Sequence, residues 1–203
     1  MIHLVIALPA ESRPLIDYYR LARRQPHGPF PVYASASTAL IVSGIGKAAA
    51  AAAVGHLQRL RGNPVQPVWL NVGVAGHGKR VPGEIILADR VTERATARSW
   101  YPPRLSPPPC ASDTVLTVDE PEHAFAEPVA YDMEAAGFCE SARRFSPAER
   151  VHCLKIVSDN AAHTPGRVTA KAARRLIEAR LDVIDRLLRL LDAPSARPEV
   201  HSA

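Results

Sequence analysis

Residues 68–78 of the chain read VWLNVGVAGHG, and this stretch decides how the rest is interpreted. Its first half, Val68–Val72, is a mostly apolar run of the kind that forms a buried strand. Its second half, Gly73–Gly78, is rich in glycine, which is typical of a tight turn. The stretch therefore predicts a buried strand that ends in a glycine-rich turn, a position where α/β proteins commonly bind ligands.

Apolar runs alternate with helical patterns on both sides of this stretch, which is typical of a mostly parallel sheet covered by helices. Further strands are expected at Ile2–Leu8, Val32–Ala34, Ala39–Ser43, Glu84–Val91, Thr114–Val118 and Val151–Val157. Helices are expected at Ala10–Arg24, Lys47–Arg61, Met133–Phe145 and, longest of all, Thr169–Leu191. The sequence predicts one three-layer α/β domain over residues 1–193, with a central twisted, mixed, mostly parallel sheet flanked by helices, and a disordered tail, Pro194–Ala203.

Composition excludes several classes of protein. No run approaches 18 apolar residues, and the N-terminus lacks a basic segment and a cleavage site, so we expect a cytoplasmic protein without membrane contact. The three cysteines, Cys110, Cys139 and Cys153, form no CxxC pair, which disfavours a disulfide framework and a zinc site. We expect no metal and no cofactor. The net charge of +5 is spread along the chain without a basic, aromatic-interleaved surface, so no nucleic-acid partner is expected.

Residues 73–80, GVAGHGKR, match the phosphate-loop pattern GxxxxGK[ST] except at its last position. Arg80 cannot supply the hydroxyl that ligates magnesium. The following Val81-Pro82-Gly83 is a turn, where a phosphate loop requires the N-terminus of a helix. An NTPase is therefore excluded.

Six segments in order resemble the purine nucleoside phosphorylase/nucleosidase superfamily, most closely the 5'-methylthioadenosine/S-adenosylhomocysteine nucleosidase-like proteins. They are VIALPAE (5–11), SGIGKAA (43–49), NVGVAG (71–76), PGEI (82–85), DMEAA (132–136) and IVSD (156–159). The resemblance implies the nucleoside phosphorylase-like fold and hydrolysis of the N-glycosidic bond of a purine nucleoside or a 5'-substituted analogue.

The resemblance also implies roles for individual residues. Glu11 matches the acid that activates water, and Asp159, beside Ser158, matches the acid that protonates N7 of the leaving purine. Met133 and Glu134 match the pair that packs on the ribose and binds its hydroxyls. Substrate-binding positions are also implied at Gly44, Gly46, Gly73, Val74, Gly76 and Lys155.

The chemistry of these residues agrees with such roles. Cleaving an N-glycosidic bond requires a proton for the leaving group and a nucleophile on the opposite face of a cationic sugar, hence two separated carboxyl groups. Other interpretations stay open: Glu11 can be an acid in the first turn of a helix, Asp159 a turn residue, and Asp132 rather than Glu134 the functional acid, or else a helix cap.

The chain also departs from the family pattern. Between Val91 and Asp132 it is shorter than the nucleosidases, and the proline-rich Trp100–Pro109, expected to be a loop, lies there. Val74 replaces a small hydroxyl residue, His77 a glycine, and Lys155 an arginine that supports the sugar site. His77, Trp100 and Tyr101 either rebuild a pocket of different selectivity or are ordinary loop residues.

Two alternatives to a nucleosidase remain. A phosphorylase needs cationic groups around phosphate, and the glycine-rich stretch has no arginine, so Arg13 or Lys47 would have to supply the charge. The third interpretation is a catalytically weak nucleoside-binding relative. In each case the partner is a small-molecule nucleoside, and we expect a homodimer, in keeping with the superfamily.

Overall fold

The computed structural model describes residues 1–24, 27–64, 66–162 and 168–192. The tail expected at Pro194–Ala203 lies outside the described residues. Ten strands form a single sheet: β1 (Ile2–Ile6), β2 (Ala22–Arg23), β3 (Val32–Ala34), β4 (Thr38–Val42), β5 (Val68–His77), β6 (Ile85–Glu93), β7 (Ser99–Trp100), β8 (Ala111–Thr117), β9 (Ala130–Asp132) and β10 (Val151–Asp159). The α/β class and the mixed sheet predicted from the sequence are confirmed.

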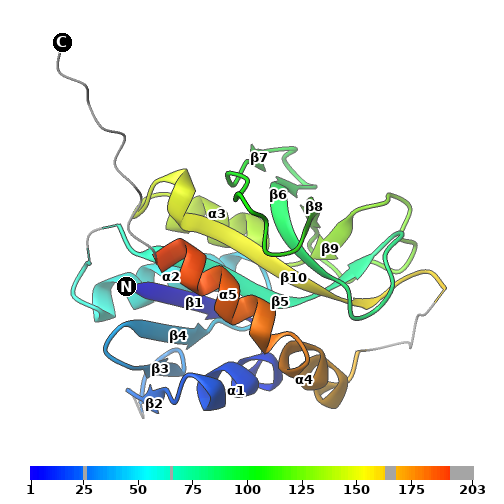
Figure 1. Ribbon diagram of the computed structural model, residues 1–203. Helices are drawn as coiled ribbons and strands as arrows, with labels where there is room; N and C mark the ends of the chain where they lie inside the picture. Colours follow the sequence, from blue (N-terminus) through cyan, green and yellow to red (C-terminus); the bar gives the residue numbers. More distant parts are fainter. Residues whose placement is uncertain (25–26, 65, 163–167, 193–203) are drawn as a thin grey trace.

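The sheet closes on itself, which corrects the expected arrangement of three layers around one central twisted sheet. Strands β5, β10, β6, β8 and β9 form a ring, because β5 pairs with both β10 and β9. Strands β1, β4, β3 and β2 extend outward from β5 (Figure 1). Pairings of β1 with β4 and β5, of β10 with β5, and of β8 with β6 and β9 are parallel, and the other five are antiparallel. The parallel pairings are also mostly the longer ones, so most of the paired residues lie in parallel strands, as expected.

The central strands follow from their sequence. In β1 and β4 every residue is buried, as expected of strands covered on both faces. On one face, α2 (Lys47–Leu60) and α3 (Ala135–Ala142) pack against each other; on the other lie α1 (Pro9–Tyr18), α4 (Ala170–Glu178) and α5 (Leu181–Asp192) (Figure 1). A short 3-10 helix, η1 (Ala148–Arg150), precedes β10. Cys139 and Cys153 are buried in the hydrophobic core between the sheet and the helices α2 and α3.

Several predicted boundaries were wrong. The glycine-rich segment is not a turn, since β5 continues to His77. The predicted long helix at Thr169–Leu191 is two helices, α4 and α5, separated at Ala179 and Arg180. The predicted helix at Ala10–Arg24 ends at Tyr18, and β2 follows. Residues 101–109 contain no helix or strand, so the predicted loop is confirmed apart from Trp100, which belongs to β7. Within the described residues, no helix is long and apolar enough to cross a membrane.

Candidate active site

Glu11 lies in the first turn of α1, directly after β1, and is 2% exposed. One carboxylate oxygen accepts a hydrogen bond from the backbone N–H of Leu8 at 3.0 Å, and the other accepts one from Val74 of β5 at 2.8 Å. Burial raises the pKa of the Glu11 carboxyl, although these two hydrogen bonds and the charge of Lys155 oppose the rise. A carboxylate with a raised pKa is a stronger base than an exposed one.

Asp132 ends β9 and is fully engaged by the protein. Its carboxylate accepts hydrogen bonds from the Thr117 hydroxyl at 2.7 Å and from the N–H groups of Glu134 and Ala135 at 3.2 and 2.7 Å. The ammonium group of Lys155 lies 2.7 Å from it. Asp132 therefore caps the first turn of α3 and pairs with Lys155, in line with the helix-cap interpretation of this residue.

Glu134 precedes α3, and among the described residues its carboxylate accepts one hydrogen bond, from the N–H of Gly46 at 2.9 Å. Gly44 and Gly46 form the turn between β4 and α2, and the N–H of Gly44 bonds the Ala7 carbonyl. Burial, assisted by the nearby charge of Asp132, raises the pKa of Glu134 to about 7. Glu134 is therefore the acid of this pair with carboxylate capacity left for a ligand.

Lys155 lies in β10 and is 1% exposed. Burial by itself would lower the pKa of its ammonium group, but the carboxylates of Asp132 and Glu134 raise it above its usual value. A Cβ atom placed on Gly73 would lie 3.3 Å from Glu11 Oε1 and 3.8 Å from Lys155 Nζ. Glycine at position 73 thus lets Glu11 and Lys155 approach the same point of β5 from two sides.

Asp159 ends β10, where its register partner in β5 is Gly76. The Ser158 hydroxyl donates a hydrogen bond to its carboxylate, and a Cβ on Gly76 would lie 3.4 Å from Asp159 Oδ2. Gly76 is three residues beyond Gly73, which Glu11 contacts, so the two acids meet β5 at points roughly 10 Å apart. The two candidate acids therefore contact the same strand, β5, at two separate points.

Phe125 is a residue that the sequence pattern did not identify. Its ring lies against Gly76, where a Cβ would be only 2.5 Å from the ring, and it packs with Leu116, Val118 and Tyr131. Met133 packs against the same cluster. The Phe125 ring and the Asp159 carboxylate therefore both lie next to Gly76, and Met133 packs against the cluster that contains Phe125. The only signal in the sequence was an isolated aromatic residue in the polar stretch PEHAFAEP (121–128).

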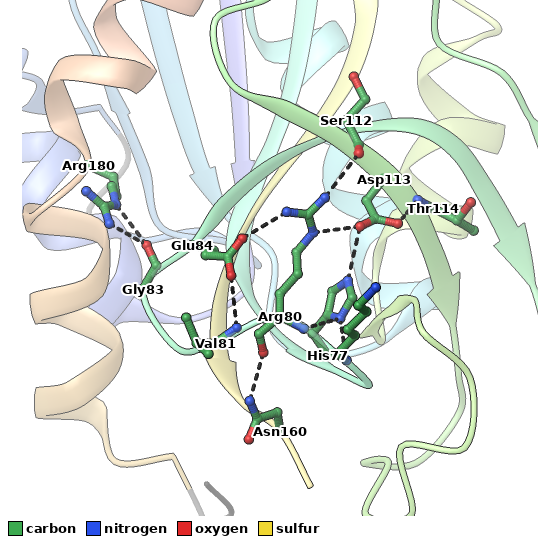
Figure 2. A network of polar contacts seen from close by, with 11 residues as sticks. His77, Arg80, Val81, Gly83, Glu84, Ser112, Asp113, Thr114, Asn160 and Arg180 are labelled. Atoms are coloured by element: carbon green, nitrogen blue, oxygen red, sulfur yellow. Dashed lines mark hydrogen bonds and ion pairs between the residues drawn. The ribbon is translucent and has the colours of Figure 1, made fainter. Parts of the chain in front are cut away.

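His77, Trp100 and Tyr101 do not gather around the candidate acids. Trp100 and Tyr101 line a cavity of about 290 Å³ that also contacts Cys139 and Val151. Val151 begins β10 and Asp159 ends it, roughly 26 Å away along the strand. His77 is buried and bonds Asp113 instead (Figure 2). Trp100 and Tyr101 therefore lie away from Asp159, whereas His77 directly follows Gly76, the register partner of Asp159.

The two cations that a phosphorylase would require have other partners. The Arg13 guanidinium is exposed and bonds Asp17 at 2.8 Å. The Lys47 ammonium group forms ion pairs with Glu93 and Asp119. In the described part of the chain, no group of three or more His, Cys, Asp and Glu side chains could hold a metal ion.

Solved structures provide the comparison for this arrangement. The apo 5'-methylthioadenosine nucleosidase of Arabidopsis thaliana aligns with a TM-score of 0.77 at 15% identity, covering 95% of this chain and 96% of that one. The chain has the nucleosidase fold.

Two ligand-bound structures share the nucleosidase fold. The 5'-methylthioadenosine/S-adenosylhomocysteine nucleosidase of Helicobacter pylori, with butyl-thio-DADMe-Immucillin-A, aligns with a TM-score of 0.74 at 14% identity over 93% of this chain and 97% of that one. The enzyme of S. pneumoniae, with a transition-state inhibitor, gives 0.71 at 18% identity over 95% and 98%. No protein-family model and no curated protein sequence matches the chain. The fold implied by the six sequence segments is confirmed.

Proposed function

We propose that the chain hydrolyses the N-glycosidic bond of a purine nucleoside or a 5'-substituted analogue. The nucleosidase fold supports this, because the neighbours in complex with inhibitors are nucleosidases. The observation that carries the proposal is the placement of Glu11 and Asp159 at two separated points of β5, with Glu134 and Lys155 near the Glu11 end.

The proposed reaction uses three carboxyl groups. Glu11 takes a proton from water as the water oxygen bonds to C1' of the sugar. Glu134 accepts hydrogen bonds from the ribose hydroxyls, and these bonds strengthen as positive charge develops on the sugar. The C1'–N bond breaks with its electron pair passing to the purine, which takes a proton at N7 from Asp159. Free base and free sugar are the products.

Water is favoured over phosphate as the nucleophile because of the charges near Glu11. Arg13 and Lys47 are paired with carboxylates, and Lys155 faces Asp132 at 2.7 Å. A phosphate dianion placed against Glu11 without an uncommitted cation would be costly to desolvate. Nothing in the geometry specifically favours the phosphorylase.

Product analysis in phosphate-free buffer tests the proposal. We expect a purine nucleoside to yield free base and free ribose, or the 5'-substituted sugar, at the same rate with and without phosphate. Glu11→Gln should lower turnover roughly 10²- to 10⁴-fold. Asp17→Asn is the matched control, since Asp17 is an exposed carboxylate on the same helix, paired with Arg13, and its change should leave turnover intact.

Two results would contradict the proposal. Activity that appears only with phosphate and gives ribose 1-phosphate would make the chain a phosphorylase. Tight nucleoside binding without turnover would make it a binding protein.

We also propose that the chain is a cytoplasmic homodimer. Ile45, between Gly44 and Gly46 at the candidate site, is 56% exposed, and a neighbouring subunit that completed the mouth of the site would cover such an apolar side chain. Light scattering should then report twice the chain mass of 22.0 kDa. A particle of the single-chain mass would exclude the dimer.

A further inference from the structure

We propose that the turn between β5 and β6, residues 77–84, is a positioning device for Asp159, and that Asn160 is the residue through which it acts. This inference rests on the proposed function, in which Asp159 is the general acid. The segment 77–84 connects β5 to β6, two strands that do not pair with each other but both pair with β10, and it is called the 77–84 hairpin below for its reversal of the chain.

The end of β10 requires positioning because its pairing with β5 is irregular. The register shifts between Val157 and Asp159, so Ser158 lies in a bulge. A bulge redirects the side chains next to it and removes part of the regular hydrogen-bond ladder. The direction of the Asp159 carboxyl therefore depends on contacts made by its neighbours in the chain.

The 77–84 hairpin holds the chain on both sides of this bulge. Before it, Val157 donates to the carbonyl of Glu84 and accepts from the N–H of Gly83, both at 2.8 Å. After it, the side-chain amide of Asn160 donates to the carbonyl of Arg80 at 2.8 Å. Asn160 is buried, and its amide oxygen accepts the N–H of Ala162 at 3.0 Å. Hydrogen bonds to the same hairpin therefore hold the chain on both sides of Ser158 and Asp159.

The hairpin is itself fixed by a set of charged and polar contacts (Figure 2). The Nδ1 atom of His77 accepts the N–H groups of Lys79 and Arg80 at 2.9 and 3.0 Å. Its Nε2 must then carry the proton, which it donates to Asp113 at 3.2 Å. Burial lowers the pKa of His77, which favours this neutral form.

Arg80 ties the hairpin to its surroundings. Its guanidinium bonds Asp113 of β8 at 2.6 Å and Glu84 at 2.8 Å, while Arg180, between α4 and α5, donates twice to the carbonyl of Gly83 (Figure 2). The carbonyl of Arg80 that receives Asn160 is therefore held by contacts with β8 and within the hairpin. A rigid acceptor at that point fixes the residue that follows the acid.

Two substrates distinguish positioning from ordinary structural support. Purine release requires protonation, whereas a 4-nitrophenyl riboside releases an anion that needs no proton. Asn160→Ala should lower turnover of the purine nucleoside roughly 10- to 100-fold, because a displacement of about 1 Å costs that much. Turnover of the nitrophenyl riboside should fall less than about threefold, by the same argument. Asp113→Ala, which loosens the hairpin without contacting β10, should give a smaller loss with the same selectivity.

Ser146→Ala is the matched control. Ser146 is 5% exposed, as is Asn160, and its hydroxyl donates a hydrogen bond to the carbonyl of Pro67 at 2.7 Å, near the start of β5. The Ser146→Ala variant removes the same kind of buried side-chain hydrogen bond far from Asp159. It should leave the ratio of the two turnover rates, for the purine nucleoside and the nitrophenyl riboside, unchanged. Asn160→Ser, a milder change, replaces the alanine variant if thermal melting shows that the latter is unfolded.

Asp159→Asn separates the two ways in which the inference can fail. If Asp159→Asn is selective for the purine substrate but Asn160→Ala lowers both rates equally, or lowers neither, the positioning inference is wrong and the proposed function stands. If Asp159→Asn itself lowers both rates equally, Asp159 is not the general acid, and the proposed role fails together with the inference.

Discussion

Two groups of charged residues lie along β5 and are built in different ways. The buried centre, formed by Glu11, Asp132, Glu134 and Lys155, is closed off from solvent, and its carboxylates are oriented mainly by backbone N–H groups. The hairpin network, formed by His77, Arg80, Glu84 and Asp113, consists largely of side-chain pairs, and Arg80 and Glu84 are 25% and 39% exposed.

This difference in burial separates chemistry from positioning. In the buried centre, burial raises the pKa of Glu11 and raises that of Glu134 to about 7. In the hairpin network, solvent screens the charges, and their attraction mainly fixes geometry. Of these two groups, the buried centre is the one whose carboxyl groups have pKa values raised toward neutral pH.

Removing Lys155 should have the largest effect on stability. Lys155→Met leaves Asp132 buried without its cation, and breaking such a pair costs about 3 to 5 kcal/mol of unfolding free energy. Urea unfolding should show this loss equally at low and high salt, because the pair is inaccessible to ions.

The double variant Lys155→Met/Asp132→Asn provides the control. It should recover part of the lost stability, since the uncompensated charge is gone. A loss below about 1 kcal/mol for the single variant would contradict the description of this pair as buried.

How far the sequence predicted these regions depends on how local their signals are. Glu11 and Asp159 were identified from the resemblance of their short sequence segments to the nucleosidase family, which is a local signal; their roles stay predictions. Glycines at 73 and 76 were misinterpreted as a turn because the groups that crowd them, Glu11 at position 73 and Phe125 at position 76, come from distant parts of the chain. In a sequence, a glycine that is needed because another side chain packs closely against its backbone cannot be distinguished from a glycine that forms a turn.

The division of the predicted helix at Thr169–Leu191 has a similar origin. Its apolar stripe continues through both α4 and α5, and neither Ala179 nor Arg180 is a helix breaker. The helices separate where Arg180 reaches the carbonyl of Gly83, almost 100 residues earlier in the chain. The partners of His77 and Arg80 in β8 were likewise invisible to any local pattern.

The pH dependence of stability should sharpen the description of the buried centre. The pKa of Glu134 is raised from 4.5 to about 7, so the folded chain binds more protons than the unfolded chain between these values. The stabilisation is complete below pH 4.5 and is lost as pH rises toward 7, an effect on the order of 1 to 3 kcal/mol. In Glu134→Gln, the unfolding free energy measured with urea should depend less on pH between 4.5 and 7. In Glu84→Gln, a change in the hairpin network, this dependence on pH should remain.

The smallest expected effect on stability belongs to the hairpin network, and it tests whether the charges of this network are screened by solvent, unlike those of the buried centre. Arg80→Met removes the guanidinium from Asp113 and Glu84 while keeping an apolar stem of similar length. Because both pairs are reached by solvent, the loss in unfolding free energy should be about 0.5 to 1.5 kcal/mol at low salt and should shrink in 1 M salt. Lys155→Met, measured under the same two conditions, should show no such reduction. If the cost of removing Arg80 were independent of salt and as large as that of removing Lys155, the hairpin would be part of the buried electrostatic centre, and its role would extend beyond holding the end of β10 in place.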